Sequence, residues 1–113
     1  MPHFVIECSA QVLTLQPAET ILREVHDVAE ATGLFRQGDI KVRIHPYRQY
    51  LVGHAKDDFI HVFGNVMQGR TIEQKADLSR RIVEGLTRLL PEVPVVSMNV
   101  VEFERATYCN RTA

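Results

Sequence analysis

The residues between 41 and 48 could bind an acidic ligand. This stretch contains no acid and holds three basic side chains, Lys41, Arg43 and Arg48, together with His45. Arginine binds carboxylates through two parallel N–H groups, which fixes both position and orientation. The stretch therefore predicts a site for a small carboxylate. A solvated strand face is the structural alternative, and the residues leave both interpretations open.

Arg70 is a further candidate for anion binding, because it stands directly before the expected start of a helix at Thr71. The N-terminus of a helix presents unpaired N–H groups and the positive end of the helix dipole, and both favour anions. A guanidinium at this position reinforces such a site. An ordinary arginine in a surface loop is the alternative interpretation.

The first two residues, Met1 and Pro2, could supply a base. An initiator methionine is commonly removed before a small second residue such as proline, and its removal leaves Pro2 with a secondary amine. The pKa of an amine falls when burial or nearby cations disfavour the protonated form. A base with a pKa near neutrality is suited to abstracting a proton beside a carbonyl. Pro2 is therefore a candidate general base, whereas a retained Met1 makes its nitrogen an ordinary amide.

Other sequence motifs for catalysis, nucleotide binding or metal binding are absent or weak. The sequence has no phosphate-binding loop, no glycine-rich dinucleotide motif, no H-E-x-x-H and no C-x-x-C. The histidines lack ligand spacing, although His3, His45 and His61 lie on expected strands and could meet in space. We expect no metal site and no cofactor. Cys8 is interpreted as a small buried hydrophobic residue at the end of a strand.

Composition places these residues in a small domain. The chain has 113 residues, of which 45% are hydrophobic and 24% are charged, and we expect one domain over residues 1–113. Thirteen basic and fourteen acidic residues give a net charge of −1, which argues against general nucleic-acid binding. No apolar run is long enough to cross a membrane. Two cysteines and the lack of a basic leader predict a reduced, cytoplasmic protein.

Hydrophobic periodicity predicts the elements that position the candidate residues. Strands are expected over residues 3–8, 40–45, 59–67 and 95–103, and helices are expected over 18–32 and 72–90. Residues 71–74 fit a capping box at the start of the second helix. The buried stripe expected on that helix consists of Ile72, Ala76, Ser79, Val83, Leu86 and Leu90, with Ile82 and Leu89 beside it. Residues 46–56 are expected to form a turn or hairpin, and the polar tail, residues 104–113, is expected to be loosely held.

The order of these elements predicts an α+β fold made of two βαβ units, over about residues 3–45 and 59–103. Right-handed crossovers place both helices on one face of a four-stranded sheet. The other face has no cover and carries mixed side chains, namely Lys41, Arg43, Asn65, Ser97 and Asn99 beside Phe63, Val101 and Phe103. A half-apolar face without a cover predicts self-association.

Four stretches of the chain resemble the 5-carboxymethyl-2-hydroxymuconate isomerases of the tautomerase superfamily. The opening nonapeptide, Met-Pro-His-Phe-Val-Ile-Glu-Cys-Ser, is similar to the start of these enzymes, and the match continues at residues 31–35, 40–45 and 69–71. The resemblance implies a duplicated βαβ fold that assembles as a trimer, with active sites near subunit boundaries. It also implies that the mature N-terminal proline is the general base and that arginines bind the substrate carboxylates and stabilise the enolate.

Carried onto this chain, the resemblance makes Pro2 the catalytic base and makes Lys41, Arg43 and Arg70 substrate-binding residues. The family strand tends to read Arg-x-Arg-x-His, and here Lys41 replaces the first arginine. Lysine keeps the positive charge but lacks the planar fork, so carboxylate placement differs. The chain is also shorter after its last strand than the family pattern.

The expected function is that of a cofactor-independent isomerase in the catabolism of aromatic compounds. Such an enzyme moves a double bond in a 2-hydroxymuconate-type carboxylate by proton transfer through Pro2. The expected partners are a small acidic substrate and two further copies of the chain in a homotrimer, with no nucleic acid and no membrane. Two alternatives stay open: a related proline-based decarboxylase or dehalogenase of small acids, and a non-catalytic binder of small carboxylates.

Overall fold

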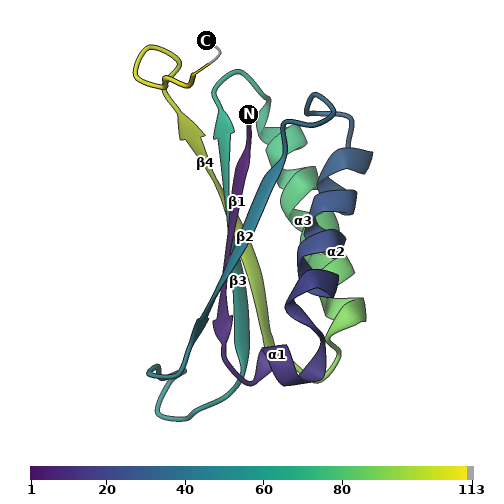
Figure 1. Cartoon of the computed structure of the whole chain (residues 1–113), viewed down its shortest axis with the longest axis vertical. Coiled ribbons are helices and arrows are strands. Elements are labelled where there is room, and N and C mark those ends of the chain that lie inside the picture. The colour runs from purple at the N-terminus through teal and green to yellow at the C-terminus, as the bar shows by residue number, and fades with distance from the viewer. Residues whose placement is uncertain (112–113) are drawn as a thin grey trace.

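The computed structural model describes residues 1–111, and within them both expected long helices and all four expected strands are present (Figure 1). The elements are β1 (His3–Ser9), α1 (Val12–Leu15), α2 (Ala18–Ala31), β2 (Lys41–Tyr47), β3 (Phe59–Met67), α3 (Ile72–Leu89) and β4 (Val95–Phe103). The one-turn helix α1 has no counterpart in the predicted elements. Among the described residues, no helix is both long and apolar enough to cross a bilayer.

The four strands form one mixed sheet in the order β2-β1-β3-β4. β1 pairs in parallel with β2, and β3 pairs in parallel with β4, while β1 and β3 are antiparallel. Each parallel pair is joined through a long helix, and both α2 and α3 lie on the same face of the sheet (Figure 1). The predicted duplicated βαβ arrangement is therefore confirmed.

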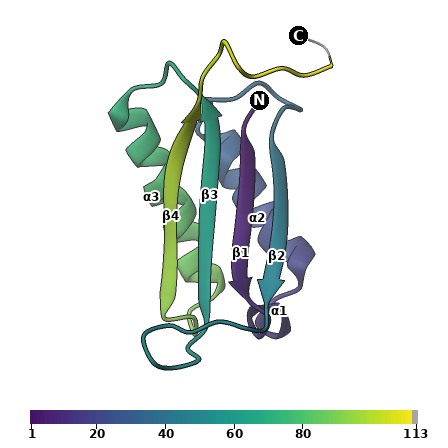
Figure 2. The same ribbon diagram turned by 90° about the vertical axis from the view of Figure 1, so that its left-hand side faces the viewer.

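The face of the sheet turned away from α2 and α3 is called here the uncovered face. Figure 2 shows this face toward the viewer, with no helix in front of it. It carries Lys41 beside His3, and Arg43 beside Val5 and Phe63, because these residues are paired across β2, β1 and β3. The prediction that one sheet face lacks a cover is confirmed for the single chain.

The core lies between the sheet and the two long helices. It contains buried side chains from β1, α2, β3 and α3, the largest of which are Phe4, Ile6, Ile21, Ile60, Leu78, Ile82, Leu86 and Leu90. Cys8 is fully buried in it, as predicted, and burial raises the pKa of its thiol to about 11. This pKa keeps Cys8 protonated and unreactive at neutral pH.

The predicted buried stripe of α3 is wrong in part. Ile72 is 78% exposed and Ala76 is also exposed, whereas Leu78, which the stripe omits, is fully buried. The buried face is rotated by about one residue, or roughly 100°. Gly85 is buried on the side of α3 that meets α2, where an added Cβ would contact Glu24 and would lie 3.4 Å from Val28 Cγ2. A glycine contributes no apolar signal, so the stripe could not reveal this contact.

The expected turn between β2 and β3 is present, and it is closed by an antiparallel bridge between Val52 and Ala55. β2 continues two residues beyond its expected end, to Tyr47, and the tail also differs from expectation. The tail crosses the end of the sheet from β4 toward β2 (Figure 2). Between residues 104 and 111 it is held by hydrogen bonds to His3 and Gln68; residues 112–113 lie outside the described part of the chain.

Candidate active site

One end of the sheet collects four chain segments. β1 and β2 both begin there, and β3 and β4 both end there, because the two parallel pairs run in opposite directions. The N-terminus, the α2–β2 loop, the β3–α3 turn and the tail consequently meet at this end (Figures 1 and 2). They enclose a cavity of about 270 Å³, called here the arginine cavity, that is lined by Met1, Phe35, Arg36, Asp39, Met67, Arg70 and Arg105.

Pro2 is buried and does not itself line the cavity, but it follows Met1, which does. The Pro2 carbonyl accepts a hydrogen bond from the Lys41 amide at 3.2 Å, which extends the β1–β2 pairing by one step. Met1, the preceding residue, lines the cavity, and its amine lies 3.3 Å from Asp39 Oδ2. The start of the chain is therefore fixed by both the sheet and an ion pair.

The terminal amine of Met1 has a lowered pKa. Burial is the main cause, because removing an ammonium group from water disfavours its charged form. The positive charges of Lys41 and Arg70 lower this pKa further, while the hydrogen bond and charge of Asp39 oppose the shift. The Met1 amine is thus easier to deprotonate here than an exposed terminal amine.

Arg70 is held rigidly at the cavity wall. Gly69, with φ of +120°, makes the turn that only glycine adopts readily, and Thr71 then starts α3 with the predicted capping box. The Arg70 guanidinium donates to the carbonyl oxygens of Met67 at 3.1 Å and Leu34 at 2.8 Å. These bonds use two of its five N–H groups, so donors remain for an anion.

Lys41 and Arg43 do not line the arginine cavity. Lys41 Nζ donates to the carbonyl oxygen of Asp39 at 2.6 Å, and Arg43 Nη1 contacts His3 Nδ1 at 3.2 Å. Both side chains belong to β2, the edge strand, and lie on the uncovered face. Arg48 follows the opposite end of β2, so the cations between 41 and 48 do not form one site within a single chain.

His3 ties the tail to the sheet. A guanidinium can only donate, so His3 Nδ1 accepts from Arg43, and Nε2 then carries the proton and faces Tyr108 Oη at 3.2 Å. Burial, followed by the charges of Arg43, Lys41 and the terminal amine, lowers the pKa of His3. The neutral form required by this pair of contacts is therefore the favoured one.

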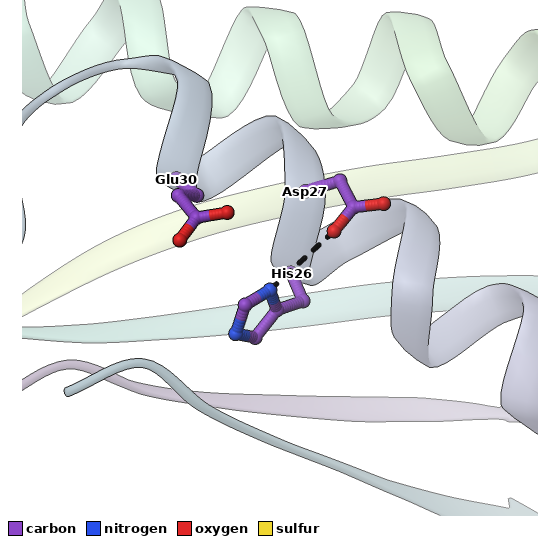
Figure 3. A group of neighbouring side chains, drawn as sticks. All are labelled: His26, Asp27 and Glu30. Atoms are coloured by element: carbon purple, nitrogen blue, oxygen red, sulfur yellow. Dashed lines mark ion pairs between the residues drawn. The ribbon is translucent and has the colours of Figure 1, made fainter. Parts of the chain in front are cut away.

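The predicted histidine positions do not converge on a metal site. The register places His45 and His61 on either side of Glu7, four residues along β1 from His3. Within residues 1–111, the group with suitable ligand atoms is His26, Asp27 and Glu30, all on α2 (Figure 3). This group lies at the helix surface, where neighbouring acids are common without a metal ion.

The sequence reasoning missed most of the cavity lining. Phe35 lies within a matched motif, and its ring stacks 4.9 Å from the Arg70 guanidinium carbon. Arg36, Asp39 and Arg105 lie outside the predicted elements and follow no period. These three residues could have been predicted from the directions of the four strands, because those directions place the α2–β2 loop and the tail beside the N-terminus.

Comparison with known proteins places the chain in a family of isomerases. The model of the 5-carboxymethyl-2-hydroxymuconate isomerase family matches residues 2–112. The chain is 24% identical over 86 residues to the 5-carboxymethyl-2-hydroxymuconate Delta-isomerase of Escherichia coli, covering 74% of this chain and 68% of that protein.

Two solved structures show the same fold. A 5-carboxymethyl-2-hydroxymuconate isomerase from Deinococcus radiodurans R1 has a TM-score of 0.85 at 21% identity, with 97% of this chain and 88% of that chain covered. A fused 4-OT described as a symmetric trimer has a TM-score of 0.80 at 14% identity, covering 98% of this chain and 95% of that chain. With its tautomerase fold and its match to the family model, the chain belongs to the 5-carboxymethyl-2-hydroxymuconate isomerase family and is an isomerase.

Proposed function

We propose that this isomerase acts without a cofactor on 5-carboxymethyl-2-hydroxymuconate or a closely similar acid, in the catabolism of aromatic compounds, and that Pro2 is its general base. The observation that carries the proposal is the position of the terminal amine. It stands at a cavity lined by arginines, and its pKa is lowered by burial and by Lys41 and Arg70. A neutral amine beside cations suits the removal of a proton from an anionic substrate.

Removal of Met1 converts the Pro2 amide nitrogen into a secondary amine. Pro2 is buried in the chain that carries Met1, and burial lowers the pKa of an amine because it disfavours the charged form. The hydrogen bond from the Lys41 amide holds its backbone in place. The base is thus created by a cleavage and positioned by the sheet.

In the proposed reaction, Pro2 accepts the proton of the 2-hydroxyl group of the dienol. The same proton returns to the carbon at the far end of the conjugated system, which gives the conjugated 2-oxo acid with no change in composition. Arg70 offsets the negative charge of the intermediate dienolate with its remaining donors. Loss of one such donor costs about 2.7–4 kcal/mol in a comparable oxyanion site.

The proposed assembly is a homotrimer in which the uncovered faces are buried. Lys41 and Arg43 lie on that face, outside the arginine cavity of their own chain. In the trimer they bind substrate carboxylates at a subunit boundary. The uncovered face and the trimeric tautomerase-fold neighbour support this arrangement.

The test of Pro2 begins with the intact mass of the protein from its native host, which is expected to lack Met1. In that form, Pro2→Ala should lower ketonisation of 5-carboxymethyl-2-hydroxymuconate, followed by ultraviolet absorbance, by about 10²–10⁴-fold. Pro91→Ala, in the exposed turn after α3, is the matched control and should keep full activity.

Complete retention of Met1 in the native host, or unchanged turnover by the Pro2→Ala variant, would remove Pro2 from its proposed role. The alternatives give different products. A decarboxylase releases carbon dioxide from the same acid, a dehalogenase releases halide from a halogenated acid, and a binding protein leaves the absorbance of the dienol unchanged while retaining it on dialysis.

A further inference from the structure

Two arginines in the arginine cavity have no part in the proton transfer described above. Arg36 comes from the α2–β2 loop and Arg105 comes from the tail, and both line the cavity together with Arg70. The lining therefore includes three arginines and one acidic residue, Asp39, which gives it an excess of positive charge.

Arg105 is fixed relative to Arg70. Its amide N–H donates to Gln68 Oε1 at 2.6 Å, and its guanidinium donates to the Gln68 carbonyl oxygen at 3.4 Å. Gln68 is two residues before Arg70 in the same turn, and its own amide donates to the Phe103 carbonyl oxygen at 3.1 Å. The end of β4 and the β3–α3 turn thus hold the two guanidinium groups as one unit.

The tail is anchored a second time beyond Arg105. Tyr108 contacts His3 Nε2 through its hydroxyl group, and its ring packs on Phe103 with centroids 5.0 Å apart. Arg105 therefore lies between two attachment points rather than on a free end. Because the tail is already ordered, Arg105 can bind a ligand without the loss of chain entropy that ordering a free tail would cost.

Arg36 lies in the short loop that also supplies Phe35 and Asp39. Its carbonyl oxygen accepts the Asp39 amide at 3.1 Å, which closes a turn. The Asp39 carboxylate has a lowered pKa, mainly because of its hydrogen bond to the terminal amine, with a smaller contribution from Arg36. Arg36 is thus only weakly engaged by Asp39, and its exposed guanidinium can bind an incoming anion.

We propose that Arg105 and Arg36 are specificity-determining residues, which bind a substrate carboxylate remote from the reacting double bonds and so select acids with two or three carboxylates. This inference rests on the proposed function, because it concerns the binding of the far end of the substrate from which Pro2 is proposed to take a proton. A cavity of about 270 Å³ lies just below the usual range for ligand pockets, about 300–1,000 Å³, which suits a small acid.

The kinetic test compares three dienols that differ in charge. They are 5-carboxymethyl-2-hydroxymuconate with three carboxylates, 2-hydroxymuconate with two, and 2-hydroxypenta-2,4-dienoate with one. Arg105→Ala should raise KM for the tricarboxylate about 10- to 100-fold, as expected for a lost charge-assisted hydrogen bond, while KM for the monocarboxylate stays unchanged. Arg36→Ala should give a smaller change in the same direction.

Two further variants separate binding from folding. Arg105→Lys keeps the charge and should recover part of the affinity for the tricarboxylate. Arg88→Ala removes one positive charge from the last turn of α3, at the other end of the helix from Arg70, and should leave all three KM values unchanged. Equal losses for all three substrates, or no loss for the tricarboxylate in Arg105→Ala, would overturn the proposal.

Binding can be measured independently of turnover. Propane-1,2,3-tricarboxylate, which has no double bond to move, should bind to the unaltered protein more tightly than butyrate in calorimetry, and Arg105→Ala should weaken this binding about tenfold. If Pro2→Ala keeps its turnover but Arg105→Ala loses tricarboxylate affinity, the proposed base fails and the carboxylate site stands. The reverse pattern overturns the carboxylate site alone.

Discussion

The charges around the first amine decide whether it accepts or keeps a proton. Burial, Lys41 and Arg70 favour the neutral amine, and Asp39 alone favours the ammonium form. Asp39 is two residues before Lys41, whose amide is bonded to the Pro2 carbonyl, so we expect its carboxylate to lie near the new amine after Met1 is removed. On this expectation, Asp39 limits how far the pKa of the proposed base can fall.

Replacing this carboxylate should shift the pH dependence of the enzyme. The base is active when deprotonated, so kcat/KM rises as pH passes through the pKa of the free enzyme. Asp39→Asn removes the anion that stabilises the ammonium form, which lowers this pKa and moves the rising limb to lower pH. Asp57→Asn, in the loop at the opposite end of the sheet, is the control, and a shift to higher pH in Asp39→Asn would contradict the assignment.

Local patterns pointed to only some of the candidate site residues. Pro2 and Arg70 could be proposed from the sequence because each stands at a recognisable position, the start of the chain and the start of a capped helix. Arg36 and Arg105 could not, because they lie in irregular segments that only the tertiary structure brings together. Arg43 was predicted as part of a cationic stretch, and strand alternation placed it correctly on the uncovered face.

At the scale of elements, the β3–α3 turn determines where Arg70 lies. The Thr71 hydroxyl oxygen accepts the Gln74 amide at 3.1 Å, and Gln74 Oε1 accepts the Thr71 amide at 2.9 Å. These two bonds satisfy donors that the first turn of α3 otherwise leaves unpaired. The helix start is consequently well defined, and Arg70 immediately precedes it.

Loss of this cap should destabilise the fold measurably. Thr71→Ala removes the acceptor for the Gln74 amide and should lower the free energy of unfolding by about 1 kcal/mol, measured by urea denaturation. Thr71→Ser keeps the oxygen and should retain most of the stability. Thr87→Ala, near the other end of α3, removes a hydroxyl that bonds back to Val83 without capping the helix, and should cost less. Equal stability of Thr71→Ala and Thr71→Ser would contradict the role of the cap.

The elements themselves could be predicted because hydrophobic periodicity and capping are local properties. The orientation of α3 could not, because it depends on contact with a second helix. Gly85 is buried where α3 meets α2, and Leu78 rather than Ile72 is buried in the core. The docking of the tail was also missed, because its anchors, His3 and Tyr108, are 105 positions apart.

For the whole molecule, the uncovered face is a side of the sheet over which the described residues place no helix (Figure 2). Phe63 is half-buried at its middle strand, and Val101 on the edge strand β4 is 46% exposed. A sheet with helices on one side only leaves such apolar groups in water unless another subunit covers them. The proposed trimer follows from this arrangement.

Sedimentation should therefore give about three times the 12.9 kDa chain mass. Phe63→Asp places a charge on the face that the trimer buries, and should shift the protein toward the monomer because an unpaired buried charge is costly. Ala76→Asp adds the same charge at an exposed position of α3 and should leave the trimer intact. A stable monomer of the unaltered protein at micromolar concentration would contradict the proposed assembly.

The location of the Met1 amine at the arginine cavity has a practical consequence for protein engineering. An affinity tag or carrier protein joined ahead of Met1 turns the nitrogen of the proposed base into a peptide amide for as long as the fusion is intact. Two copies linked head to tail offer an amine only in the leading copy, so the proposed role of Pro2 predicts that the second copy of such a tandem is inactive. A cleavable leader that ends directly before Pro2 restores the group.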